Sequence, residues 1–290
     1  MANLKEVRNR IVSVGSTMQI TSAMKMVSAS KLKRAQDAIL KMRPYANKLR
    51  EILENLSSGW DPSESTYARQ FLGEKKNVLL VVITSNRGLC GGFNANIIKK
   101  ASLLIRTEYQ NCNIHLVTIG KKGTDFFKKT AYTLAASPNE ILNGLSYANV
   151  APVAEQIMQD FAKCNYDHVE LVYNQFKNAA VQLPVNEQFL PVIPPEINSE
   201  KTNTTDYIFE PNKSEIVLDL IPRSLKTQLY KALLDSQASE HGARMTAMHK
   251  ATDNAKEMIR VLKLNYNKAR QAAITGEILE IVGGSEALNN

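Results

Sequence analysis

Apolar residues near the start of the chain recur at the spacing of a helix. From the fourth residue they fall alternately three and four positions apart, at Leu4, Val7, Ile11, Val14 and Met18. This spacing predicts a coiled-coil seam along one face of an α-helix. The apolar stripe then changes phase and continues through Ile20, Met24, Val27, Leu32, Ala35, Ile39 and Met42. Because Pro44 interrupts it, we expect a kink or short break near Arg43 and a further helical stretch to Leu56.

The last third of the chain carries a second helical seam, with steps of four and three at Met248, Thr252, Ala255, Ile259, Leu262, Tyr266, Ala269 and Ala273. Pro222 suits a first helical turn, and Gly283 and Gly284 suit a terminus, which predicts one helix from Pro222 to about Val282. Roughly 60 residues at about 1.5 Å each span about 90 Å, more than a compact domain needs. We therefore expect the two ends of the chain to pair as an antiparallel coiled coil.

Between the two seams the period changes from that of a helix to that of strands. Residues 78–83 (VLLVVI) form a continuous apolar run, typical of a strand buried on both faces of a parallel sheet. A short helix from Asn94 follows, and then a strand at 114–119, a helix at 153–164 and a strand at 168–173. This alternation predicts a small, Rossmann-like α/β domain.

The expected fold class is thus an α/β domain combined with a long antiparallel coiled coil of the N- and C-terminal helices. We expect five segments along the chain, namely an N-terminal coiled-coil helix at 1–56, a connector at 57–75, the α/β domain at 76–195, a second connector at 196–214 and a C-terminal coiled-coil helix at 215–290.

The composition sets the broad class of protein. The chain has 290 residues, of which 44% are hydrophobic, enough for a sizeable core. It has no apolar run of the roughly 18 to 20 residues that a membrane span needs, and its opening MANLKEVRNR lacks the apolar block of a signal peptide, so we expect a soluble, intracellular chain. The three cysteines, Cys90, Cys112 and Cys164, are widely spaced, which favours reduced thiols over a zinc or redox site.

The net charge of +8 is concentrated at one end of the chain. Residues 1–50 hold eleven Lys or Arg and two Asp or Glu, a net charge of +9. Such a basic segment favours an acidic partner, although it can equally be the solvated face of a helix. Tyr45 is its one aromatic residue and gives little capacity to stack on bases, which argues against nucleic acid.

Motifs for nucleotide binding and catalysis are weak. Residues 84–94 (TSNRGLCGGFN) follow a strand and open a helix, but they match neither GK[ST] nor G-x-G-x-x-G, and residues 120–125 (GKKGTD) also lack a phosphate cradle. The four histidines have no i, i+4 pair, and the sequence has no GxSxG or HExxH; they are His115, His168, His241 and His249. We therefore expect no catalytic site, metal or cofactor, and glycines that serve a structural turn.

Two other classes of protein stay open at this point. A nucleic-acid-binding coiled-coil protein predicts steeply salt-dependent binding of the purified chain to DNA or RNA. An α/β enzyme with helical arms predicts saturable binding of a nucleotide to the isolated chain.

Three blocks of the sequence resemble gamma subunits of F-type ATP synthases. They are NLKEVRNRIVSVGSTMQITSAMKMVSASKLKRA near the start, SNRGLCGGFN in the middle, and ARMTAMHKATDNAKEMI followed by NKARQAAITGEILEIVGG near the end. The resemblance implies a central stalk that couples rotation of a proton-driven c-ring to ATP synthesis on beta subunits, without a catalytic site of its own. It also implies the partners, which are the ring of alpha and beta subunits, an epsilon-type subunit and the c-ring, with no nucleic acid. The membrane is then reached only through the c-ring, at the cytoplasmic face of the bacterial cell membrane.

The resemblance also implies which residues meet the ring of alpha and beta subunits. These are Met24, Lys25, Arg244, Arg270, Gln271, Thr275 and Glu277. Beyond them, an apolar bearing would turn inside a sleeve, since apolar contact is non-directional; it consists of Ile278, Leu279, Ile281 and Val282. The chain departs from the family pattern at Gly276, where Gln is usual, at Asn86, where Asp is usual, and at Ser285, where Ala is usual.

Overall fold

The computed structural model describes residues 4–57, 66–69, 76–192 and 213–288. By contacts the chain divides into two units, and both long helices pass from one unit to the other. The helix-pair unit consists of Met1–Ser28 and Met245–Asn290, and the sheet unit is Ala29–Arg244. The elements in chain order are α1 (Leu4–Ser57), η2 (Thr66–Ala68), β1 (Asn77–Ile83), α2 (Phe93–Thr107), β2 (Asn113–Ile119), α3 (Lys121–Phe127), β3 (Thr133–Ala136), η3 (Asn139–Leu142), α4 (Tyr147–Ala162), β4 (His168–Phe176), β5 (Gln182–Leu190) and α5 (Lys213–Leu288).

The sheet has five strands in the order β3-β2-β1-β4-β5. The first four strands are parallel, and β5 pairs with β4 in the antiparallel sense. Because β1 lies in the middle, its side chains are buried on both faces, as the run at 78–83 predicts. The chain moves outward through β2 and β3 and then crosses to the other side of β1, which places a topological switch point between β1 and β4.

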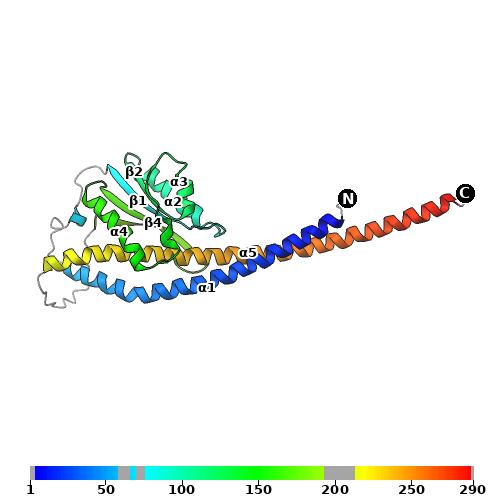
Figure 1. The fold of residues 1–290 in the computed structure, drawn as a ribbon, viewed down its shortest axis with the longest axis horizontal. Helices are drawn as coiled ribbons and strands as arrows, with labels where there is room; N and C mark the ends of the chain where they lie inside the picture. The colour runs from blue at the N-terminus through cyan, green and yellow to red at the C-terminus, as the bar shows by residue number, and fades with distance from the viewer. Residues whose placement is uncertain (1–3, 58–65, 70–75, 193–212, 289–290) are drawn as a thin grey trace. The chain divides into compact units, whose positions relative to one another are not determined.

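Each face of the sheet is covered by helices from the same unit. On one face, Val78, Leu80 and Val82 of β1 pack with α2 and with Phe127 of α3. On the other face, the intervening residues of β1 pack with α4 and with the first part of α5, which contributes Ile221, Leu225, Leu229 and Leu233. Because successive side chains of β1 point to opposite faces of the sheet, the strand packs with α2 and α3 on one face and with α4 and α5 on the other (Figure 1).

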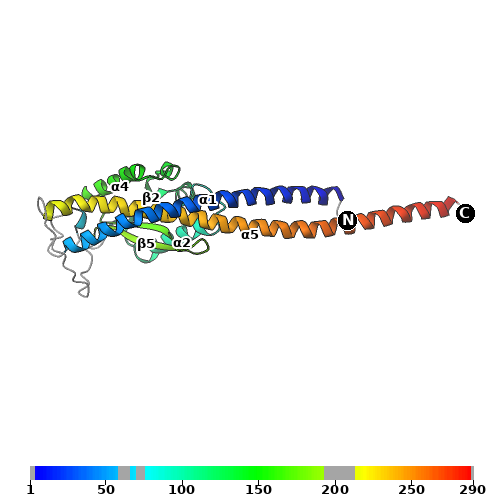
Figure 2. The same ribbon diagram turned by 90° about the horizontal axis from the view of Figure 1, so that it is seen from below.

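In the helix-pair unit, the start of α1 lies beside α5 and runs in the opposite direction, and the last part of α5 extends past the N-terminal end of α1 (Figures 1 and 2). Thr21 contacts Thr252, and one turn further along α1 Lys25 contacts His249, so the residue numbers rise on one helix while they fall on the other. The expected fold class, an α/β domain with an antiparallel pair of terminal helices, is confirmed. The division into five segments stays a prediction, and the connectors at 57–75 and 196–214 lie largely outside the described residues.

The seam along α1 differs from the expected one in its middle part. Ile20 is 61% exposed and Val27 is 56% exposed, whereas Thr21 is half-buried and Ser28 is buried. The heptad spacing of the first residues thus continues without a change of phase, with polar residues at inward positions. On α5 the expected seam is less exposed than its flanks as far as Ala269, but Ala273 is exposed.

The ends and interruptions of the long helices also differ from expectation. α1 is one continuous helix with Pro44 inside it, so the break predicted near Arg43 is wrong. α5 begins at Lys213 and contains Pro222 in its interior, and it continues through Gly283 and Gly284 to Leu288. Neither glycine would place an added Cβ within 4 Å of another group, so packing does not single out these positions. Five elements of the sheet unit were not expected from the sequence, namely η2, α3, β3, η3 and β5.

Candidate functional site

Helix α5 contacts the sheet near the switch point, at the carboxyl end of β4. Open α/β sheets bind ligands there, beyond the carboxyl ends of the strands. Ser239 of α5 donates a hydrogen bond of 3.0 Å to the carbonyl of Asn174, at the end of β4. The Asn174 side chain in turn donates to the carbonyl of Phe93, at the start of α2, at 3.2 Å. Gly242 allows close approach, since an added Cβ would lie 3.1 Å from the Cα of Ala179.

The loop after β1 is held by hydrogen bonds of its own side chains. The Asn94 amide oxygen accepts the backbone N–H of Ser85 at 3.0 Å, and the Asn94 amide nitrogen donates to the Ser85 hydroxyl at 2.8 Å. The Ser85 hydroxyl donates to the carbonyl of Arg87 at 2.7 Å. These bonds occupy polar groups of Ser85, at the start of the loop, and of Asn94, in the first turn of α2. They support a structural turn at 84–94, and the absence of nucleotide binding there stays a prediction.

The motif at 120–125 is also used for packing. Gly120 has φ of +119°, and an added Cβ would lie 2.3 Å from the carbonyl oxygen of Thr84. The backbone N–H of Gly123 donates to the Thr84 hydroxyl at 2.9 Å, and that hydroxyl donates to the Gly120 carbonyl at 3.1 Å. The glycines therefore let the start of α3 rest against the end of β1.

Arg244, one of the expected contacts with the ring, is buried in the sheet unit and is 8% exposed. Its guanidinium donates to a carboxylate oxygen of Glu240 at 2.6 Å and to the carbonyl of Arg87 at 3.0 Å. It also lies 3.5 Å from Nδ1 of His241. These contacts fasten α5 to the loop after β1, and a direct contact of Arg244 with a partner stays a prediction.

Burial shifts the pKa of both acidic and basic groups around Arg244. Burial raises the pKa of Glu240, against the opposing attraction of Arg244. Burial lowers the pKa of His241 to about 4, and the positive charges of Arg244 and Lys31 act in the same direction. His241 is therefore neutral near pH 7, so a hydrogen-bonded neutral ring lies beside the buried ion pair.

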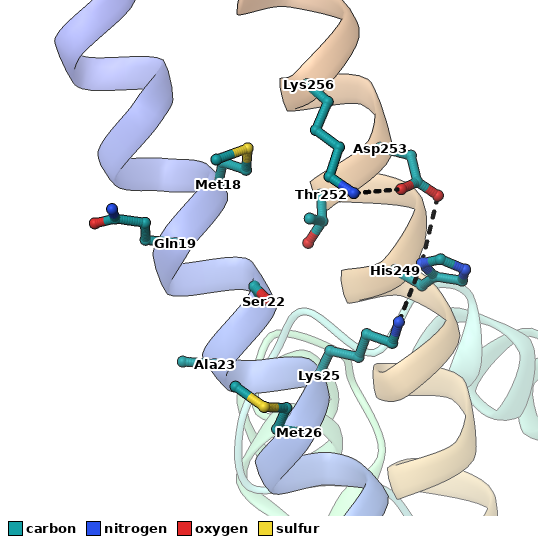
Figure 3. Close-up of a pocket in the computed structure, with 10 residues that line it drawn as sticks. All are labelled: Met18, Gln19, Ser22, Ala23, Lys25, Met26, His249, Thr252, Asp253 and Lys256. Carbon is teal, nitrogen blue, oxygen red and sulfur yellow. Dashed lines mark hydrogen bonds and ion pairs between the residues drawn. The ribbon is translucent and has the colours of Figure 1, made fainter.

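Met24 and Lys25, two further expected contacts, lie half-buried on α1 in the helix-pair unit. Lys25 borders a cavity of about 330 Å³ between α1 and α5 (Figure 3). Its residues are Met18, Gln19, Ser22, Ala23, Lys25, Met26, His249, Thr252, Asp253 and Lys256. A row of charged or titratable groups crosses one side of this cavity.

The row is connected through one nitrogen of His249. Its Nδ1 lies 3.5 Å from Nζ of Lys25 and 3.3 Å from a carboxylate oxygen of Asp253, and Lys256 lies 3.8 Å from the other oxygen of Asp253. An unprotonated Nδ1 accepts from Lys25, whereas a protonated Nδ1 donates to Asp253. Whether Nδ1 of His249 carries a hydrogen therefore decides whether the ring bonds to Lys25 on α1 or to Asp253 on α5. The pair at His249 and Asp253 is exposed, so its ion pair contributes little stability.

The remaining expected residues lie along the exposed end of α5. Arg270, Gln271, Thr275 and Glu277 are exposed. The residues expected to form an apolar bearing are exposed by 54 to 72% and are Ile278, Leu279, Ile281 and Val282. About twenty residues of helix, on the order of 30 Å, separate this group from His249, so the structure does not bring the two groups together.

Several residues of these sites were not singled out from the sequence. The i, i+4 spacing of Glu240 and Arg244 is a recognisable sign of an ion pair on a helix. The bond from Arg244 to the carbonyl of Arg87 joins residues 157 positions apart and leaves no local pattern. Among the described residues, no helix combines the length and the apolarity of a membrane span, and no group of three or more His, Cys, Asp or Glu could hold a metal ion.

Comparison with known proteins gives the same family along the whole chain. A family profile described as ATP synthase matches residues 3–288. The ATP synthase gamma chain of Christiangramia forsetii is 59% identical over 290 residues, covering 100% of both chains. The ATP synthase gamma chain of Flavobacterium johnsoniae is 60% identical over 291 residues, again covering 100% of both chains.

Solved structures agree. The central stalk and c-ring structure of the Tetrahymena thermophila mitochondrial ATP synthase contains a chain that is 26% identical, with a TM-score of 0.58, over 80% of this chain and 99% of that one. A chain of the Euglena gracilis mitochondrial ATP synthase, in a structure of OSCP, F1 and c-ring in rotational state 3, has the same fold, with a TM-score of 0.71 at 23% identity over 98% of this chain and 94% of that one.

The fold defines an α/β protein with an antiparallel pair of terminal helices, one of which packs against the sheet. With relatives at this identity over its full length, the chain belongs to the family of ATP synthase gamma chains. This assignment decides in favour of the stalk interpretation over the nucleic-acid-binding protein and the nucleotide-binding enzyme.

Proposed function

We propose that this chain is the rotating central stalk of an F-type ATP synthase and carries no catalytic site itself. Its partners are then the ring of alpha and beta subunits, an epsilon-type subunit and the c-ring. The chain would reach the cytoplasmic face of the bacterial cell membrane through the c-ring alone. Proton-driven rotation of the c-ring turns the stalk, and the stalk drives ATP synthesis at sites on the beta subunits.

The proposal rests on one observation, which is that apolar side chains are exposed at the end of α5. Apolar side chains in water are unfavourable, and a helix end that exposes four of them needs a partner. Ile278, Leu279, Ile281 and Val282 fall within an arc of roughly 160° on one face of the helix, since successive residues on a helix point about 100° apart. We infer that an apolar surface of a partner covers this exposed apolar face, and that the helix end turns against it because apolar contact is non-directional.

The helix-pair unit also has the asymmetry that a stalk needs. Near the cavity, one side carries Lys25, His249 and Lys256, whereas the exposed apolar residues Ile20 and Val27 lie elsewhere on α1. A single asymmetric rod in a threefold ring presents a different face to each catalytic site, and this stabilises three different conformations. As the rod turns, each catalytic site passes through the three conformations in sequence. Because coupling free energy is reciprocal, ATP hydrolysis drives the rod in the opposite direction.

The contacts implied by family resemblance can be tested in the assembled complex. We propose that Arg270 and Gln271 contact the ring, because both are exposed and neither has a described partner within the chain. Arg270→Ala with Gln271→Ala should reduce ATP synthesis per complex while the isolated chain keeps its unfolding midpoint.

Asn265→Ala with Lys268→Ala is the matched control, since it removes one amide and one cation from other exposed positions of the same helix. If the chain does not co-purify with alpha and beta subunits, the proposed function is wrong. If it does, but both double variants synthesise ATP at the wild-type rate, only the assignment of these two contacts is wrong.

A further inference from the structure

Arg244 joins two segments of the sheet unit that are far apart in sequence. It lies on α5, and its guanidinium donates to the carbonyls of Arg87 at 3.0 Å and Gly88 at 3.4 Å. Glu240, one turn earlier on α5, holds the other side of the guanidinium at 2.6 Å. Only a planar, multidentate cation can reach a carboxylate and two carbonyls at once, which explains an arginine at this position.

The same loop is also held by a hydrogen bond and by packing of its own side chains. The Ser85 hydroxyl donates to the carbonyl of Arg87, the group that also accepts from Arg244. Cys90 is 2% exposed and packs with Phe93 and with Ala243 of α5. The loop backbone is thus fixed between α2 on one side and α5 on the other.

Two side chains of this loop point away from these anchors. Leu89 is 65% exposed and Arg87 is exposed. Leu89 has φ of +64°, a left-handed conformation that a leucine adopts only when its surroundings impose it. The contacts of Arg244 on the two preceding carbonyls supply such a constraint.

We propose that Arg244 is a positioning residue, which clasps the loop at 85–90 onto α5 and thereby presents Leu89 and Arg87 to the ring of alpha and beta subunits. The inference rests on the proposed function for its partner, and on the geometry of the sheet unit for the clasp. It differs from a direct contact between Arg244 and the ring. In a direct contact the guanidinium itself binds the partner, whereas here it acts through the loop.

The clasp is tested first in the full-length chain, by the reactivity of Cys90. In a background with Cys112→Ser and Cys164→Ser, Cys90 is the single thiol. Arg244→Ala should increase its rate of labelling by a maleimide about tenfold or more, because hydrogen bonds from a charged donor to the loop are lost. Arg223→Ala is the matched control, since Arg223 forms an exposed i, i+4 ion pair with Asp219 on the same helix.

Global unfolding would also expose Cys90, and the dependence on urea separates the two cases. Labelling through local opening of the loop is nearly independent of urea at low concentration, whereas labelling through global unfolding rises steeply. Urea-independent acceleration in Arg244→Ala supports the clasp. A labelling rate equal to that of Arg223→Ala, or an acceleration that depends steeply on urea, overturns it.

The action through the loop is tested in the reconstituted complex by a double-mutant cycle with Leu89→Ala. The readout is the number of ATP molecules synthesised per complex per second. A positioning role predicts non-additivity, in which Arg244→Ala has a smaller further effect once Leu89 is truncated, because only Arg87 is then left for the loop to present. Additive losses overturn the positioning role. If the wild-type chain fails to assemble with the ring, the proposed function fails, and the labelling result still decides whether the clasp exists.

Discussion

Thr21 and Thr252 face each other across the helix pair, and their hydroxyl oxygens are 2.9 Å apart. Each hydroxyl also lies close to a carbonyl of its own helix, Met18 for Thr21 and Met248 for Thr252. The two helices are therefore joined by a polar contact at a position where a coiled coil normally has apolar side chains. Such contacts specify register at some cost in stability.

This contact predicts opposite effects for single and double replacement. Thr21→Val alone should destabilise the pair by about 1 kcal/mol, because the Thr252 hydroxyl loses its partner across the interface. Thr21→Val with Thr252→Val should recover that loss or exceed it, because both polar groups are gone from the seam. Hydrogen exchange of the amides at 4–28 in the full-length chain measures the effect. Faster exchange in the double variant than in the single variant would contradict this account of the seam.

Gly276 predicts a gain in helix stability. It lies inside α5, and an added Cβ meets no other group within 4 Å. Gly276→Ala should therefore slow hydrogen exchange of the neighbouring amides, by an amount that corresponds to about 1 kcal/mol of helix propensity. Ala272→Gly, four residues earlier on the same exposed helix, is the reverse control and should accelerate exchange. Equal exchange in all three chains would show that propensity does not limit the stability of this helix end.

Gly120 predicts a large loss of stability. Its φ of +119° disfavours any side chain, and an added Cβ would lie 2.3 Å from the backbone of Thr84. Gly120→Ala should lower the free energy of unfolding by more than about 2 kcal/mol, as measured by urea denaturation. Gly144→Ala, whose Cβ would meet only the Asn149 side chain at 3.9 Å, should change it little. Similar losses in the two variants would refute the steric explanation for Gly120.

His241 predicts a dependence of stability on pH. Burial, together with Arg244 and Lys31, lowers its pKa from 6.5 to about 4. Between these values the unfolded chain binds a proton on His241 that the folded chain does not, so this residue makes the fold less stable as the pH falls. Asp235 acts in the opposite sense, since burial raises its pKa from 3.8 to about 6 and the folded chain then binds the extra proton.

The two opposing contributions are separated by substitution. His241→Gln should be less destabilising at pH 5 than at pH 7.5, by on the order of 2 kcal/mol. At pH 5 the wild-type chain must remove the proton from His241 when it folds, and the variant does not have this free-energy cost. Urea denaturation at the two pH values measures this difference. Asp235→Asn is the complementary variant and should shift the balance the other way. The same loss from His241→Gln at both pH values would mean that the pKa of His241 is not lowered by folding.

The sequence predicts well the features that depend on local periodicity. The run at 78–83 identifies β1, and the spacing of Leu4, Val7 and Ile11 identifies the seam of α1. The same rule fails at Thr21 and Ser28, where the inward position is polar and the more apolar neighbours Ile20 and Val27 face outward. Hydrophobicity alone cannot show this, since the half-buried Thr21 finds a hydrogen-bond partner in Thr252 on the other helix.

Proline and glycine interrupt or end the two long helices less than the sequence predicts. Pro44 and Pro222 lie inside helices whose neighbouring turns continue, and Gly283 and Gly284 do not end α5. The internal role of Arg244 was also missed, because its partner carbonyls belong to a loop that reaches α5 only in the folded sheet unit. The exposed residues from Arg270 to Val282 were named through family resemblance, and their contacts with a ring stay predictions.

The most direct test of the central claim is to watch this chain inside the assembled ring. With the ring of alpha and beta subunits fixed to a surface and a probe attached to the sheet unit, we predict continuous rotation of the probe in one direction when ATP is supplied. Hydrolysis of ATP by such complexes while the probe stays stationary would contradict the account, because the chain would then occupy the ring without transmitting rotation.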